Sequence, residues 1–131
     1  HEWDIPRLLK VGKTQMQIHK IIEKIFPGEE VVSNFKHPEL RFSGSNYSME
    51  LDIWVPSMKL AIEYQGEQHF MKFMRGNFVE SKSELESLQR RDQEKREACA
   101  EVGIILIEVD YTWDRTKKSI EKLIRVHETN D

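Results

Sequence analysis

The sequence predicts an α/β fold in which one mixed sheet carries helices on both faces. Two alternating segments, 49–55 and 60–65, flank a Pro-Ser turn, as the strands of a hairpin do. A continuous apolar segment at 104–109 is typical of a buried central strand. A long segment with helical spacing, 81–102, separates the hairpin from that strand, so we expect the strand to run parallel to one strand of the hairpin.

We expect the elements in the order helix, three strands, helix, strand, helix. The first helix is predicted over 14–26, with Thr14 as its N-cap and Pro27-Gly28 at its end. One stripe of this helix is apolar and carries Ile18, Ile21, Ile22 and Ile25. The first strand is predicted over 30–36, and a polar loop that contains Pro38 leads from it into the hairpin.

The second half of the chain is expected to begin irregularly, over 66–80. Ser81 or Ser83 would cap the long helix, and Gly103 would end it because glycine adopts the left-handed conformation at little cost. The last helix is predicted over 115–127, where apolar residues again recur at helical spacing.

Length and composition favour one globular domain over 1–131, with a lead-in at 1–12 and a core at about 14–127. With 38% hydrophobic and 33% charged residues, the chain is neither disordered nor a membrane protein, so no membrane partner is expected. Cys99 is the single cysteine, which excludes an intrachain disulfide and a thiolate zinc site. An intracellular, reducing compartment is therefore expected, either cytoplasm or nucleus.

The net charge of −3 argues against tight, unassisted binding to DNA, because phosphate contacts supply most of such affinity. Bound metal ions would offset part of the negative charge, and the basic residues cluster locally. These clusters are Lys72 with Arg75, Arg90-Arg91 with Lys95-Arg96, and Lys117-Lys118. An additional DNA-binding domain outside this chain would also account for the weak positive charge.

Carboxylates stand among apolar residues in both strands of the hairpin. Alternation predicts one apolar face made of Met49, Leu51, Ile53 and Val55. If the strands pair, Glu50, Asp52 and Glu63 converge on the other face. Three anions in a small space repel one another and raise their pKa values unless a cation lies among them. Hard ions such as Mg²⁺ prefer such oxygen ligands.

The long helix carries two charges on the stripe that should face the sheet. This stripe consists of Leu85, Leu88, Asp92, Lys95, Cys99 and Val102. A charge on a buried stripe is costly unless it is paired or takes part in chemistry. Asp92 therefore either pairs with Lys95 or Arg96 at helical spacing, or belongs to a functional site.

The strand–turn–strand unit with Asp52 and Glu63, between an opening helix and a long second helix, resembles the PD-(D/E)xK nuclease superfamily. It is most similar to the branch of the EDxHD homing endonucleases and the very short patch repair endonucleases. In that pattern E and D correspond to Glu50 and Asp52, xH to Gln68-His69, and the last D to Asp92. The likeness covers roughly residues 14–110 and implies a restriction-endonuclease-like αβββαβ core with a four-stranded sheet.

The resemblance implies a DNA endonuclease that depends on Mg²⁺ (or Mn²⁺) and acts most readily on double-stranded DNA, as a nicking or homing-type enzyme. Asp52 would be the principal metal ligand, Glu63 would be a second ligand or would hold a metal-bound water, and the Tyr64 carbonyl would complete the shell. Glu50 would be a further ligand or would orient one. His69 would transfer a proton, and Asp92 would fix its tautomer.

The chain departs from the superfamily pattern at the usual lysine, which is Gln65 here. Either Lys95 from the long helix supplies the missing charge, or His69 takes that role, as in the homing-endonuclease branch. Gln15 likewise stands where related nucleases often carry an acidic residue in the first helix. Contacts with nucleic acid are expected from Lys72, Arg75 and Arg91.

Two alternatives stay open at this stage. The first is a catalytically degenerate module that binds nucleic acid, suggested by Gln65 in place of lysine. The second is a protein-interaction domain, suggested only by the acidic charge balance. One site of this kind cuts one strand, so double-strand cleavage would need a homodimer or two successive cuts.

Overall fold

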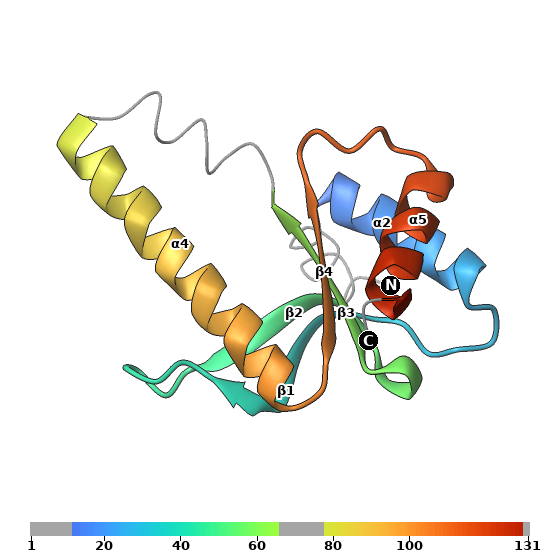
Figure 1. Ribbon diagram of the computed structural model, residues 1–131, viewed down its shortest axis with the longest axis horizontal. Coiled ribbons are helices and arrows are strands. Elements are labelled where there is room, and N and C mark those ends of the chain that lie inside the picture. The colour runs from blue at the N-terminus through green and yellow to red at the C-terminus, as the bar shows by residue number, and fades with distance from the viewer. Residues whose placement is uncertain (1–11, 66–77, 130–131) are drawn as a thin grey trace, which may run out of the picture.

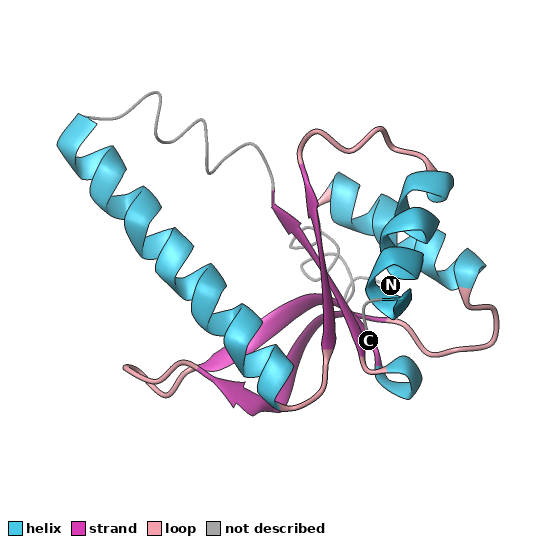
Figure 2. Cartoon of the chain, in the orientation of Figure 1, coloured by secondary structure: helices cyan, strands magenta, loops and turns pink. Residues whose placement is uncertain are grey.

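The computed structural model describes residues 12–65 and 78–129, which form one mixed sheet with helices on both faces (Figures 1 and 2). The strands are β1 (Val32–Arg41), β2 (Ser48–Val55), β3 (Leu60–Gln65) and β4 (Ile105–Asp110). The helices are α2 (Lys13–Ile25), α4 (Phe78–Glu101) and α5 (Lys117–Thr129), with a 3-10 turn, η1 (Pro56–Met58), between β2 and β3. The predicted order of elements is confirmed.

The sheet order is β1-β2-β3-β4. The pairs β1–β2 and β2–β3 are antiparallel, and β4 pairs with β3 in parallel, with Leu60 opposite Ile105. The chain is therefore α+β with a four-stranded mixed sheet, and the parallel placement of the last strand is confirmed. Among the described residues, no helix is both long enough and apolar enough to cross a membrane.

Two apolar cores lie on opposite faces of the sheet. The core beneath α2 and α5 is built from Ile18, Ile22, Ile53, Val55, Leu60, Ile62, Ile107, Val109, Ile120 and Ile124. The core beneath α4 is built from Leu40, Met49, Leu51, Trp54, Ala61, Cys99 and Ile104. Burial of this apolar surface is the main favourable term that holds the helices against the sheet.

The predicted apolar face of β2 is wrong in one respect. Ile53 and Val55 pack beneath α2 and α5, but Met49 and Leu51 pack on the α4 face. The alternation changes phase where Asn34 of β1 adopts a φ of 53°, a left-handed conformation that breaks the regular pleat. The alternation of apolar and polar residues in the sequence could not reveal that Asn34 adopts a left-handed conformation.

Several ends differ from the predicted ones. The N-cap of α2 is Gly12, so Thr14 lies inside the helix, where its hydroxyl accepts a hydrogen bond from Arg115 (2.7 Å). Because α4 already begins at Phe78, Ser81 and Ser83 are not its caps. The prediction of a loop at Pro38 is also wrong, since β1 runs through it; proline is tolerated there because β1 is an edge strand.

Candidate functional site

A small cavity of about 150 Å³ lies on the α4 face of the sheet, near the carboxyl ends of β3 and β4. It is lined by Asp52, Glu63, Tyr64, Gln65, Asp92, Lys95, Leu106 and Glu108. Four separate elements, β2, β3, β4 and α4, therefore contribute to one pocket whose lining is mostly polar and charged.

The two central carboxylates are held by amides of the opposite strand. The backbone N–H of Asp52 donates to Glu63 Oε2 (2.7 Å), and the backbone N–H of Tyr64 donates to Asp52 Oδ2 (2.9 Å). The β2–β3 register ends at the pair Ile53 and Ile62. Beyond that pair, carboxylate oxygens accept the hydrogen bonds that backbone carbonyls would accept in a regular ladder. Both carboxylates are therefore fixed to the backbone of the sheet.

Lys95 brings an ammonium group from α4 to this pair of carboxylates. Its Nζ contacts Glu63 Oε1 and the backbone carbonyl of Glu50. The side chains of Lys95 and Glu63 are only 16% and 11% exposed, so the ion pair is largely shielded from water. The cation that the clustered carboxylates require is therefore supplied, in this structure, by the chain itself.

Burial controls the protonation of both partners. Burial raises the pKa of Asp52, against the hydrogen bond from the Tyr64 amide and the charge of Lys95, which lower it. Burial also lowers the pKa of Lys95, although the surrounding carboxylates, Asp52 foremost, favour its charged form. Titratable groups perturbed in this way often mark functional sites.

A second ion pair forms the rim of the cavity. Arg96 of α4 contacts Glu108 of β4, with one Nη2–Oε2 distance of 2.9 Å, and Gln65 donates to the same carboxylate (3.4 Å). The hydrogen bond to Glu108 raises the pKa of Arg96. The Gln65 amide thus binds Glu108, where the superfamily pattern would place a lysine.

Helix α2 supports the site from the other face of the sheet. Gln15 Nε2 donates to the side chain of Asn34 (2.9 Å) and to the backbone carbonyl of Asp52 (3.0 Å). The inverted backbone at Asn34 lies beside Asp52, so Gln15 ties together the two strands where their pleat changes phase. Gln15 therefore positions the backbone that carries Asp52.

The structure brings most of the predicted site residues together. Those around the cavity are Asp52, Glu63, Tyr64, Gln65, Asp92 and Lys95. Glu50 is exposed and contributes its backbone carbonyl, and the guanidinium of Arg91 lies over the Phe42 ring at 4.7 Å. His69, Lys72 and Arg75 lie outside the described residues.

Two residues of the site were not found by sequence reasoning. Glu108 was assigned to an apolar strand and given no role in the site. Arg96 was considered only as part of a basic cluster or as a helical partner of Asp92. The available signal was the single charge of Glu108 within the apolar segment 104–109. The prediction of a buried central strand at 104–109 is wrong, because β4 is an edge strand whose apolar residues are covered by helices. A charge in such a strand needs a partner, but only the tertiary structure shows that Arg96 provides it.

The carboxylate oxygens at the cavity are ligands of the kind that a hard divalent cation prefers. Asp52 and Glu63 provide carboxylate oxygens, and Mg²⁺ commonly binds one or two carboxylates and keeps several waters. Within 12–65 and 78–129, no three side chains from His, Cys, Asp and Glu are grouped as a ready-made metal site. Because Lys95 occupies Glu63 Oε1, a bound divalent ion would have to compete with the ammonium.

No protein-family model and no solved structure matches the chain. It is similar to uncharacterized protein 307L of Invertebrate iridescent virus 6, with 38% identity over 77 residues, which is 59% of this chain and 38% of that protein. Uncharacterized protein 094L of Frog virus 3 is 41% identical over 78 residues, 60% of this chain and 47% of that protein. The chain therefore spans less than half the length of these viral relatives, whose names assign no activity.

Proposed function

We propose that the chain is a metal-dependent DNA endonuclease with a restriction-endonuclease-like core of the PD-(D/E)xK kind, nearest to the EDxHD branch. The observation that carries this proposal is the convergence of Asp52, Glu63 and Lys95 on one small cavity. These residues come from two adjacent strands and a crossing helix. The order of the sheet and its helices on both faces support the same core.

Hydrolysis of a phosphodiester needs neutralisation of the phosphate charge, an activated water and stabilisation of the leaving oxygen. Asp52 and Glu63 would hold Mg²⁺ (or Mn²⁺), which when bound supplies charge neutralisation and lowers the pKa of a bound water. Lys95 takes the place of the lysine that position 65 lacks. Because burial lowers the pKa of Lys95, its Nζ gives up a proton more readily, which suits protonation of the leaving oxygen.

The substrate of this proposal is double-stranded DNA, approached along the exposed side of α4. Arg91 and Arg96 are both exposed on this helix, and Arg96 stands at the rim of the cavity. His69, Lys72 and Arg75 keep their expected roles in proton transfer and phosphate contact. The setting of this activity would be intracellular, and further DNA contacts would come from a domain outside this chain.

A second candidate function, a degenerate module that binds nucleic acid without cutting it, is favoured by one observation. Both oxygens of Glu63 already have protein partners, namely the Asp52 amide and Lys95. A site that carries its own cation does not require a metal. This candidate predicts salt-sensitive, metal-independent binding and no cleavage of any substrate.

Cleavage of supercoiled plasmid in Mg²⁺, Mn²⁺ or EDTA distinguishes the two functions. The nuclease predicts nicked or linear product that depends on the metal and disappears in Asp52→Ala. Glu63→Gln, which alters the other proposed metal ligand, should also lose cleavage. Glu101→Gln, at an exposed position on α4, is its matched control and should cut like the parent. Cleavage that persists in Asp52→Ala would refute the proposed site, and binding without cleavage by the parent would favour the degenerate module.

A further inference from the structure

Strand β4 is an edge of the sheet, and no described segment pairs with its outer side. The backbone N–H of Ile105 donates to the Lys59 carbonyl, so residue 105 directs its polar groups inward to β3. Since successive residues alternate, Leu106 and Glu108 direct theirs outward, as do the Ile104 carbonyl and the Asp110 amide at the ends. The Ile104 amide instead donates to the Cys99 carbonyl (2.9 Å), and the Asp110 carbonyl accepts from the Trp113 amide (3.1 Å). An edge of this kind is a template for another strand.

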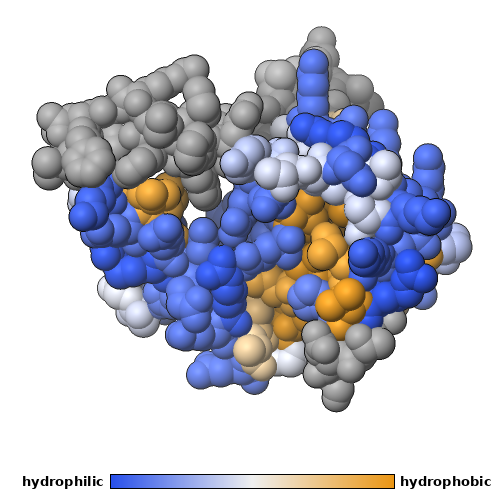
Figure 3. Space-filling model, turned by 45° about the horizontal axis from the view of Figure 1, so that its top comes forward, coloured by the Kyte–Doolittle hydropathy of each residue, from blue (hydrophilic) through white to orange (hydrophobic). Residues whose placement is uncertain are grey.

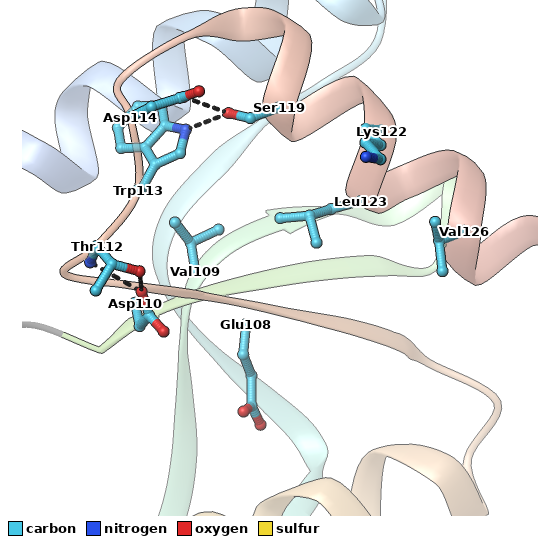
Figure 4. A pocket seen from close by; sticks show the side chains of 10 residues that line it. All are labelled: Glu108, Val109, Asp110, Thr112, Trp113, Asp114, Ser119, Lys122, Leu123 and Val126. Atoms are coloured by element: carbon cyan, nitrogen blue, oxygen red, sulfur yellow. Dashed lines mark hydrogen bonds between the residues drawn. The ribbon is translucent and has the colours of Figure 1, made fainter.

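Hollows flank this edge on both faces of the sheet. One, of about 460 Å³, lies between β4 and α5, where Val109, Leu123 and Val126 point into it and Glu108 points to the other side of the strand (Figure 4). The other, of about 430 Å³, lies towards α4 and is lined in part by Ala100. Figure 3 shows apolar side chains gathered in the middle of one face, next to the place of β4 and α5 in Figure 1.

We propose that a second copy of this chain adds its β4 to this edge in antiparallel orientation, with the two Ile107 residues facing each other on the twofold axis. This register is the one that pairs every outward amide and carbonyl of Leu106 and Glu108, and it places the Asp110 amide opposite the Ile104 carbonyl of the other copy. Leu106 then lies opposite Glu108 of the second copy, and Ile104 lies opposite Asp110, in both directions. Shifting the centre by one residue along the strand keeps the pairing of polar groups but shortens the overlap.

The apolar side chains of β4 complement themselves in this register. On the α5 face, Ile105 lies opposite Val109 of the second copy, and Ile107 lies opposite itself. Such cross-strand pairs of branched apolar residues stabilise antiparallel sheets. Val126, which is 46% exposed beside the hollow, lies where the two α5 helices approach each other.

The charges at the ends of the strand also complement each other. The ammonium of Lys59 donates to the Val102 carbonyl (3.0 Å) and lies 3.7 Å from the place of a Cβ on Gly103, at the start of β4. Asp110 lies at the opposite end of the strand. Lys59 aligns with residue 104, so within one copy these two charges are separated by six residues, or about 20 Å, along the parallel strands. Antiparallel pairing places each Asp110 beside the start of the other β4, where the second copy's Lys59 is.

Sedimentation equilibrium of the full chain and of charge variants tests this interface, which does not depend on the proposed activity. The parent should dimerise, and Lys59→Asp should raise the dimer Kd roughly tenfold, because two symmetric attractions become repulsions. Lys59→Asp combined with Asp110→Lys should restore the parent Kd. Asp110→Asn, which keeps an acceptor for the Thr112 amide, controls for the local turn. Val126→Asp should weaken the dimer independently.

Amide hydrogen exchange locates the contact. In the dimer, the outward amides of Leu106 and Glu108 should become protected as concentration rises, whereas those of Ile105 and Ile107, already bonded to β3, should not change. A parent chain that stays monomeric at the highest soluble concentration overturns the proposal. So does a dimer in which Leu106 and Glu108 gain no protection, or one that the double charge swap fails to restore.

Discussion

Replacing Lys95 by methionine removes the ammonium that lies at the carboxylates of Asp52 and Glu63, while keeping a side chain of similar length. In the parent, Lys95 contacts Glu63 Oε1 and the Glu50 carbonyl, and the two paired side chains are only 16% and 11% exposed. In Lys95→Met, Glu63 keeps its hydrogen bond from the Asp52 amide but becomes a largely buried anion without a counter-ion.

Removing one partner of a buried ion pair typically costs about 3 to 5 kcal/mol. Because Glu63 retains some exposure and one hydrogen bond, we expect the lower end, about 3 kcal/mol. That loss is a large fraction of the roughly 5 to 15 kcal/mol that holds a domain of this size folded. Lys82→Met, at an exposed position on the same helix, should change the free energy of unfolding by less than about 0.5 kcal/mol.

Urea unfolding at neutral pH, in EDTA and then in MgCl₂, measures this effect. The double variant Lys95→Met with Glu63→Gln should recover most of the loss, because no buried anion remains. If Asp52 and Glu63 hold a divalent ion, MgCl₂ should stabilise Lys95→Met more than the parent, since the ion no longer competes with the ammonium. A loss below about 1 kcal/mol in EDTA would refute the view that Glu63 is a buried anion that depends on Lys95 as its counter-ion.

Two further predictions concern protonation and backbone strain. Burial raises the pKa of Asp52, so the folded chain binds its proton more tightly than the unfolded chain, and the stability due to this group falls as pH rises from about 3.9 through the folded-state pKa. Asp52→Asn should remove this fall. The unfolding free energy of the variant minus that of the parent should therefore increase across that pH interval. A difference that does not depend on pH in urea titrations would contradict this prediction. Gly103 ends α4 with a φ of 75°, so Gly103→Ala should lower the free energy of unfolding by about 1 kcal/mol, whereas Gly44→Ala, at a position with open space, should change it less.

The order of the elements was predictable because apolar periodicity is a local property of the chain. The sheet-facing stripe of α4 could be predicted from residue spacing alone. Two of its members, Asp92 and Lys95, line the cavity, as residues on that face of the helix should. The ends of elements were less predictable. Ser81 and Thr14 are good caps by type, but the start of a helix also depends on tertiary contacts that sequence spacing does not contain.

Which residues pair with each other in the site was harder to predict than which residues belong to the site. Helical spacing offered Asp92 as a partner for Lys95, yet the ammonium of Lys95 reaches across to Glu63 on the sheet. Arg96 likewise pairs with Glu108, which is far along the chain. Such choices depend on the distance between α4 and the sheet, which the packing of large apolar side chains sets. The catalytic and metal-binding roles themselves stay predictions.

The change of phase at Asn34 divides the sheet between two layers of the molecule. Among the odd-numbered apolar residues of β2, Met49 and Leu51 pack with α4 and Ile53 and Val55 pack with α2 and α5, while Trp54 packs on the α4 side. The outer half of the β1–β2 hairpin therefore packs against α4 together with Trp54 and Ala61, whereas the core beneath α2 and α5 contains no residue of α4. Because Lys95 reaches the carboxylates from α4, local detachment of α4 would dismantle the site without disrupting the core beneath α2 and α5. The integrity of the site can thus be lost at a smaller free energy than that of global unfolding.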